Sequence, residues 1–256
     1  MFRNYVVLSF CCLSLLTVPP FVGSQALAAA EKQIATQKQP VSERERASLL
    51  VQVEKNYAKM QSLECSFQQL SKSGGRVREG NGKAFFFRPG GASDSKDFAA
   101  KGGVIRWEYL GPDEQTIIND GQEIQIYTPA DKQLLISSAE ALDADLTYAL
   151  FTGQSSLSET FTVSEGDADF QLSPPPSGLR ALYLVPKEPQ SQLKQAQIWI
   201  NKDLQIERLL MEDYFDALTE LSFSDMRFDR IKPGDRAKIQ QLRTLKTTPD
   251  TEIIRQ

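Results

Sequence analysis

Residues 105–129 consist of short apolar and aromatic runs that are separated at regular spacing by turn signals. The breaks are dipeptides typical of tight turns: Gly111-Pro112, Asp120-Gly121 and Thr128-Pro129. Runs of this length between such breaks predict a meander of antiparallel strands. The rest of the chain has to extend or cover this predicted sheet.

The first strand of the meander alternates in polarity. Ile105, Trp107 and Tyr109 occupy every second position, and Arg106 and Glu108 lie between them. Successive side chains of a strand point to opposite faces, so one face of the sheet is expected to be apolar and the other solvated.

The sequence contains no histidine among its 256 residues. This excludes Ser-His-Asp and Cys-His hydrolysis, histidine general bases and most catalytic zinc sites. No spacing of carboxylates, Lys, Tyr or Cys suggests a catalytic or metal-binding arrangement, so neither an enzyme nor a cofactor is predicted. A formal charge of −4 without a basic cluster argues against nucleic acid as a partner.

The first 30 residues have the pattern of a secretory signal peptide. Arg3 supplies the positive charge, residues 6–18 form a short apolar run, and small residues place cleavage near Ala28 or Ala30. The alternative is a lipoprotein signal ending at Cys11 or Cys12, but the bulky Phe10 precedes Cys11. We therefore expect an exported, soluble mature chain, with residues 31–256 as a single domain.

Two segments have helical periodicity. Ser42 and Glu45 form a capping box, and the apolar residues that follow predict an amphipathic helix over residues 42–61. A second capping box beginning at Ser137 introduces a helix whose apolar stripe includes Leu142 and Leu146. Ser156 and Glu159 predict a further short helical turn.

Strands are predicted on both sides of these helices. The alternation of Leu63, Cys65 and Phe67 indicates a strand, and Phe85-Phe86-Phe87 places aromatic rings on both faces of the next one, so both faces need cover. Later strands are predicted over residues 161–164, 168–173, 179–186, 194–201, 204–212 and 218–228. Helices that cover such a sheet loosely leave a pocket for an apolar ligand, but the residues alone leave open whether the core is solid or hollow.

The order of several motifs resembles the LolA-type outer-membrane lipoprotein carriers of Gram-negative bacteria. The matching segments are L-x-C-x-F-x-Q at 63–69, Arg88-Pro89, R-W-E-Y at 106–109, D-G at 120–121, Y-x-P at 127–129, L-x-P-K at 184–187 and T-x-P-x-T-E-I-I at 247–254. The chain departs from the family in its enlarged loop at 90–103, in Ile105 where an aromatic residue is usual, and in Gln125 where a Trp is usual.

The resemblance implies an α+β, mainly β fold: an unclosed antiparallel half-barrel with helices forming a lid over an apolar cavity. It implies a monomeric periplasmic carrier of lipoprotein acyl chains, with an inner-membrane ABC transporter and an outer-membrane receptor as partners. The expected wall and lid residues are Phe85, Phe87, Ile105, Trp107, Tyr109, Leu142 and Leu146. Arg88 would latch the lid through its backbone carbonyls, although on the residues alone it could instead pair with Glu108 or Glu79. The alternatives are a solid-core interaction module and a lipid- or lipoprotein-sensing relative.

Overall fold

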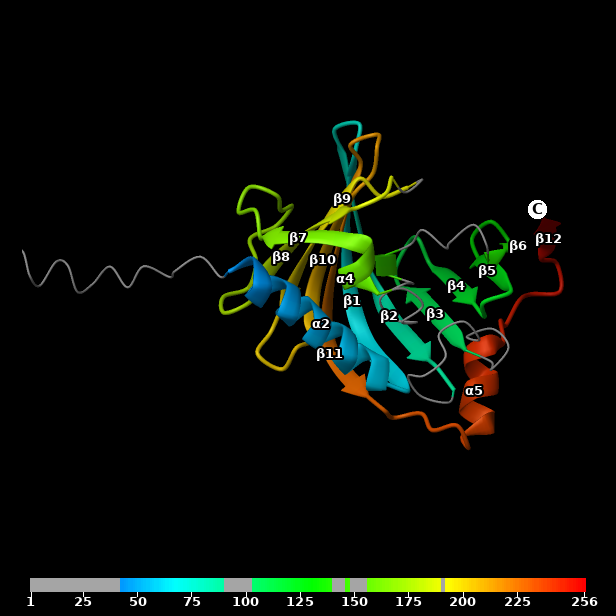
Figure 1. The fold of residues 1–256 in the computed structure, drawn as a ribbon. Coiled ribbons are helices and arrows are strands. Elements are labelled where there is room, and N and C mark those ends of the chain that lie inside the picture. The colour runs from blue at the N-terminus through cyan, green and yellow to red at the C-terminus, as the bar shows by residue number, and fades with distance from the viewer. Residues whose placement is uncertain (1–41, 90–102, 140–145, 148–155, 190–191) are drawn as a thin grey trace, which may run out of the picture. The chain divides into compact units, whose positions relative to one another are not determined.

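One continuous β-sheet organises the molecule (Figure 1). The computed structural model describes residues 42–89, 103–139, 146–147, 156–189 and 192–256, all within the unit Val41–Gln256. The strands are β1 (Ser62–Ser73), β2 (Arg76–Phe87), β3 (Val104–Tyr109), β4 (Gln115–Asn119), β5 (Glu123–Thr128), β6 (Gln133–Ser138), β7 (Phe161–Glu165), β8 (Arg180–Pro186), β9 (Gln195–Ile200), β10 (Ile206–Glu212), β11 (Leu218–Phe228) and β12 (Glu252–Arg255). The helices are α2 (Glu43–Lys59), α4 (Leu157–Thr160) and α5 (Arg236–Arg243).

The sheet has two free ends and is therefore unclosed. Its twelve strands follow the order β12-β6-β5-β4-β3-β2-β1-β11-β10-β9-β8-β7, so β12 and β7 are the edges. Every neighbouring pair is antiparallel except β12 with β6, which is parallel. The predicted fold class, a mainly β and unclosed antiparallel sheet with added helices, is confirmed.

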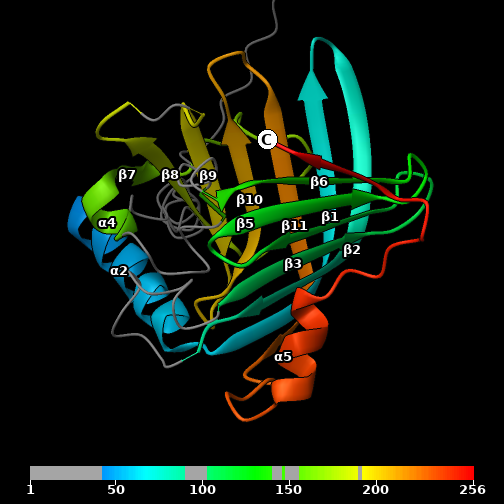
Figure 2. The same cartoon turned by 90° about the vertical axis from the view of Figure 1, so that its right-hand side faces the viewer.

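The sheet curves so that its two halves face each other. In Figure 2 strands β3–β6 run across β10 and β11 rather than alongside them. Helix α2 packs against α4 and β7 and covers part of the concave face. Its buried residues Leu50, Val53 and Tyr57 join one apolar cluster with residues of β1, β2 and β7–β11. The concave face beneath α2 is therefore filled by a packed apolar cluster.

The start of α2 follows the predicted capping box. The Ser42 side chain accepts from the Glu45 backbone N–H at 3.3 Å, and Glu45 Oε2 accepts from the Ser42 N–H at 2.8 Å. These two bonds satisfy amides that have no partner within the helix. The short turn predicted at Ser156 is also present, because Ser156 caps α4 by accepting from the Glu159 N–H.

Strand β2 is covered on both faces, as its run of three phenylalanines predicts. Phe86 belongs to the large cluster of the concave face, and its neighbour Phe87 belongs to a separate cluster beneath α5. Both are 2% exposed. Helix α5 therefore packs on the convex face, against β3 and the end of β2.

Two of the local predictions are wrong. Residues 168–173 do not form a strand, because the N–H groups of Leu172 and Ser173 donate to the buried carboxylate of Glu220 rather than to a neighbouring strand. Ser137 does not cap a helix, because it lies within β6, where it pairs with Ile124 of β5. Here strand pairing outcompetes the local capping signal.

No helix in the described part of the chain is both long enough and apolar enough to cross a membrane. The predicted signal peptide and cleavage sites, residues 90–102 of the enlarged loop, and Leu142 lie outside the described residues.

Candidate functional site

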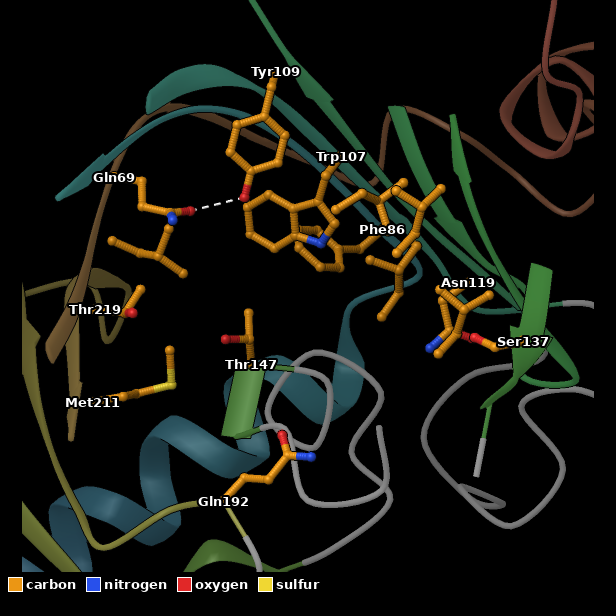
Figure 3. A pocket seen from close by; sticks show the side chains of 15 residues that line it. Gln69, Phe86, Trp107, Tyr109, Asn119, Ser137, Thr147, Gln192, Met211 and Thr219 are labelled. Carbon is orange, nitrogen blue, oxygen red and sulfur yellow. Dashed lines mark hydrogen bonds between the residues drawn. The ribbon is translucent and has the colours of Figure 1, made fainter. Parts of the chain in front are cut away.

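A cavity of about 470 Å³ lies between the two halves of the curved sheet (Figure 3). Most of its lining comes from β1–β6 on one side and from β10 and β11 on the other. The lining residues are Gln69, Phe86, Ile105, Trp107, Tyr109, Ile117, Asn119, Ile124, Ile126, Ser137, Thr147, Gln192, Met211, Thr219 and Leu221. The volume lies within the range of small-molecule sites, and most of the lining side chains are apolar or aromatic.

Packed aromatic rings form one wall. The Trp107 ring meets Phe67 and Phe86 edge to face, with centroid distances of 4.9 and 5.6 Å. Tyr109 donates its hydroxyl to Gln69 Oε1 at 2.8 Å, as Figure 3 shows. Edge-to-face packing and the hydrogen bond hold these rings in place, so the wall is present before any ligand binds.

Gly82 makes this packing possible. A Cβ at this position would lie 1.9 Å from the carbonyl oxygen of Glu108 and 2.8 Å from the Phe67 ring. This glycine is therefore needed for the close approach of β3 and of the Phe67 ring.

Three of the predicted wall residues line the cavity: Ile105, Trp107 and Tyr109. Leu146 is buried in the concave core cluster, 2% exposed, and its neighbour Thr147 reaches the cavity.

The prediction that Phe85 and Phe87 line the cavity is wrong, because both lie in the cluster beneath α5 on the convex face. The register of β2 and β3 explains this placement. Phe86 stands opposite Ile105, whereas Phe85 stands opposite the outward Arg106. The inward ring is therefore Phe86, which the prediction missed.

The prediction also missed Ile117, Ile124 and Ile126, together with Met211 and Leu221 from the far side. Ile124 and Ile126 alternate with Gln125, so their shared face was visible in the sequence. The side of the sheet on which that face lies depends on long-range pairing, such as that of Ile117 with Trp107.

Arg88 lies at the C-terminal end of α2. Its Nη2 is within hydrogen-bonding distance of three backbone carbonyls, those of Tyr57 (2.6 Å), Ala58 (3.1 Å) and Met60 (2.9 Å). The residue is 6% exposed, and burial lowers the pKa of its guanidinium. The last carbonyls of a helix lack internal partners and carry partial negative charge. The buried guanidinium therefore both donates hydrogen bonds to these carbonyls and compensates their charge.

Glu108, one of the two carboxylates considered as a partner for Arg88, is engaged elsewhere. Glu108 Oε1 accepts from Arg106 Nε at 2.6 Å on the convex face. Arg106 Nη1 also donates to the carbonyls of Leu242 and Thr244, at 3.3 and 3.1 Å, at the end of α5. Helices α2 and α5 thus each have an arginine side chain at their C-terminal end, Arg88 for α2 and Arg106 for α5.

Within the described residues, no three Cys, Asp or Glu side chains are grouped as they would be around a metal ion. The single described cysteine, Cys65, is buried, and burial raises its thiol pKa to about 12. A thiol held protonated in an apolar environment is a poor nucleophile.

Residues 98–234 match the sequence model of a family described as outer membrane lipoprotein carrier protein LolA, and this match covers more than half of the chain. The chain belongs to the LolA family. The resemblance seen in the motifs is therefore confirmed, and β3 to β11 of the sheet fall within the match.

Individual relatives of this LolA-family chain are distant. The outer-membrane lipoprotein carrier protein of Chromohalobacter salexigens is 26% identical over 164 residues, which cover 62% of this chain and 66% of the relative. That of Cupriavidus pinatubonensis is 29% identical over 153 residues, covering 59% and 67%. The chain thus spans about two thirds of the length of these relatives.

Solved structures of similar proteins include a putative outer membrane lipoprotein-sorting protein domain from Vibrio parahaemolyticus. It has a TM-score of 0.43 and 12% identity, with 79% of this chain and all of that chain (100%) covered. A LolA superfamily protein from Nitrosomonas europaea has a TM-score of 0.35 and 11% identity, with 73% and 94% covered.

Proposed function

We propose that this protein carries lipoproteins by enclosing their acyl chains in the cavity of about 470 Å³ between the two halves of the sheet. The observation that carries the proposal is this cavity, with its mostly apolar lining, in a member of the LolA family. The family match and the carrier-protein names of the relatives support binding and transport rather than catalysis.

The expected affinity fits a carrier. Burial of one methylene is worth about 0.8 kcal/mol, so about ten methylenes give ~8 kcal/mol, which is close to micromolar affinity. Such a complex holds an acyl chain in water and still releases it to a stronger acceptor.

The proposed setting is the periplasm, between an inner-membrane ABC transporter that loads the carrier and an outer-membrane receptor that unloads it. The carrier-protein names of the relatives and the predicted signal peptide support this setting. Intact-mass analysis of the exported protein is expected to find a monomer that begins just after Ala28 or Ala30. A mature chain that begins at a diacylated Cys11 or Cys12 would refute the soluble carrier.

Arg88 is proposed as the latch of the empty state. Its guanidinium fixes the end of α2 over the sheet, and a long acyl chain that enlarges the cavity would have to displace this end. The Arg88→Leu protein should then bind acylated peptide as well as the wild type or better, but deliver it poorly, because the closed state no longer competes with ligand. Transfer from loaded carrier to receptor-bearing membranes tests this role, and unchanged transfer by the folded variant would reduce Arg88 to a structural anchor.

The central experiment is displacement of a hydrophobic fluorophore by an acylated peptide, with lipid identified by mass spectrometry of the purified protein. Ile126→Trp should block the cavity. Gln125→Trp, at the preceding position on β5, adds the same ring outside the cavity lining. We expect displacement from the wild type and from Gln125→Trp, and at least tenfold weaker binding by Ile126→Trp. Equal binding by all three proteins, or no binding by any, would refute the proposal and favour a solid interaction module.

A further inference from the structure

Among the polar side chains that line the cavity, the amide of Asn119 has a buried nitrogen that is left without a hydrogen bond. Asn119 is the last residue of β4, is 3% exposed and lines the cavity. Among the described residues its Nδ2 has no hydrogen-bond partner. Buried amide groups without a partner are rare in folded proteins, so this donor calls for an explanation.

The orientation of the amide is fixed by the turn that follows it. Asn119 Oδ1 accepts from the Gly121 backbone N–H at 2.7 Å. The reverse orientation would place two donors against each other, so the oxygen must face the turn. The NH₂ group therefore points away from the turn, and Figure 3 shows the Asn119 side chain among the residues that line the cavity.

The surroundings of this NH₂ group are those of a binding pocket. Asn119 pairs with Ile124 of β5, which in turn pairs with Ser137 of β6, so the three share one face of adjacent strands. Figure 3 shows Asn119 and Ser137 together at one end of the lining, while Gln69 and Thr219 lie at the other end. The Gln69 amide is hydrogen-bonded to Ser71 and Tyr109, so the unsatisfied donor of Asn119 distinguishes the two ends and gives a bound molecule a defined direction.

We propose that Asn119 Nδ2 donates a hydrogen bond to a carbonyl oxygen of the bound acyl ligand. The cavity would then recognise a chain that carries an ester or amide carbonyl, and not a hydrocarbon chain alone. This inference rests on the proposed carrier function and deepens it, because it names the chemical group that the site recognises. The acyl ester of a lipoprotein and that of a phospholipid share this chemistry, so either source can supply the carbonyl.

Matched pairs of ligands test the proposal on the full mature chain. One arm uses a diacylglyceryl peptide and its dialkyl-ether analogue, and the other uses an ester phospholipid and its ether analogue with the same chain length. The wild type should bind the ester at least about tenfold more tightly than the ether, since a satisfied buried amide is worth roughly that ratio. The arm that shows the preference identifies the source of the ligand.

Two variants locate the effect. Asn119→Leu is close in size but has no donor, so its ester-to-ether ratio should fall to about one while ether binding is kept or improved. Thr116→Val removes a hydroxyl from the same strand, outside the cavity lining, and should leave the ratio unchanged. The carbonyl stretch of an isotope-labelled ester bound to the wild type should also shift to lower frequency, a readout that does not depend on the folding of any variant.

Two results would overturn the inference. Equal binding of ester and ether by the wild type in both arms, with no shift of the carbonyl stretch, removes the role of Asn119 and leaves the carrier function intact. An ester preference that persists in Asn119→Leu likewise refutes it. No binding of any of the four ligands would overturn the carrier proposal itself, and this inference with it.

Discussion

Replacing Arg88 with leucine should loosen the C-terminal turn of α2. The two hydrogens of Nη2 are shared among the carbonyls of Tyr57, Ala58 and Met60, so two charged hydrogen bonds are lost rather than three. At about 1.5–3 kcal/mol each, they give a gross loss of ~3–6 kcal/mol. The leucine side chain needs no desolvation of a charge, which offsets part of this loss, so we expect a net loss of about 3 kcal/mol.

Urea unfolding measures the global loss, and hydrogen exchange shows where it lies. A loss of about 3 kcal/mol corresponds to roughly a hundredfold faster exchange for the amides at the end of α2, if that turn opens locally. Arg106→Leu is the matched control, because Arg106 contacts the end of α5 in the same way. It should speed exchange in α5 and leave α2 unchanged. A loss below about 1 kcal/mol for Arg88→Leu, with unchanged exchange in α2, would show that the reasoning is wrong.

Three further substitutions test the structure at separate points. Gly82→Ala should destabilise the protein by about 3 kcal/mol because its Cβ would overlap the Glu108 carbonyl, whereas Gly80→Ala, with its nearest neighbour at 3.4 Å, should cost far less in thermal unfolding. Burial raises the pKa of the Cys65 thiol from 9.0 to about 12, so the unfolded chain releases this proton first. The contribution of the protonated thiol to the free energy of unfolding is complete below pH 9 and is lost as the pH rises toward 12, by roughly 1.4 kcal/mol per pH unit. The free energy of unfolding of Cys65→Ala should therefore fall less steeply between pH 9 and 10. Glu220→Gln removes the charge that holds residues 172–173 on the convex face, and should lower the free energy of unfolding by about 3 kcal/mol. This segment should then become the first site of limited proteolysis. Cleavage of the variant at the wild-type rate would contradict this expectation.

Local signals were sufficient for most of the sheet and for α2. The capping box at Ser42 and the alternation of Ile105, Trp107 and Tyr109 each depend on residues a few positions apart, and both are as predicted. The hydrogen bonds from Arg88 to backbone carbonyls at the end of α2 were expected from the family resemblance, since the residues alone left a carboxylate partner open.

The errors come from interactions between distant segments. Phe85, Phe86 and Phe87 are identical in type, and only the pairing of β2 with β3 decides which ring faces inward. The stretch 168–173 has the composition of a strand, but a carboxylate about fifty positions later binds its amides. Asn119 directly precedes the Asp120-Gly121 turn, and no local signal distinguishes it, because its burial and unsatisfied donor arise only in the folded sheet.

The parallel strand β12 has a consequence for self-association. An unclosed sheet exposes backbone donors and acceptors at its edges, and such edges pair readily with other copies. The four residues of β12 cover this edge of β6, and Lys132 holds Asp250 just before β12 at 2.5 Å. Removing residues 252–256 would uncover β6, so the expected result is a concentration-dependent oligomer in sedimentation rather than an unfolded chain. The four-residue β12 thus replaces the six-residue edge of β6 with a shorter edge of its own, which offers less backbone for pairing with another copy.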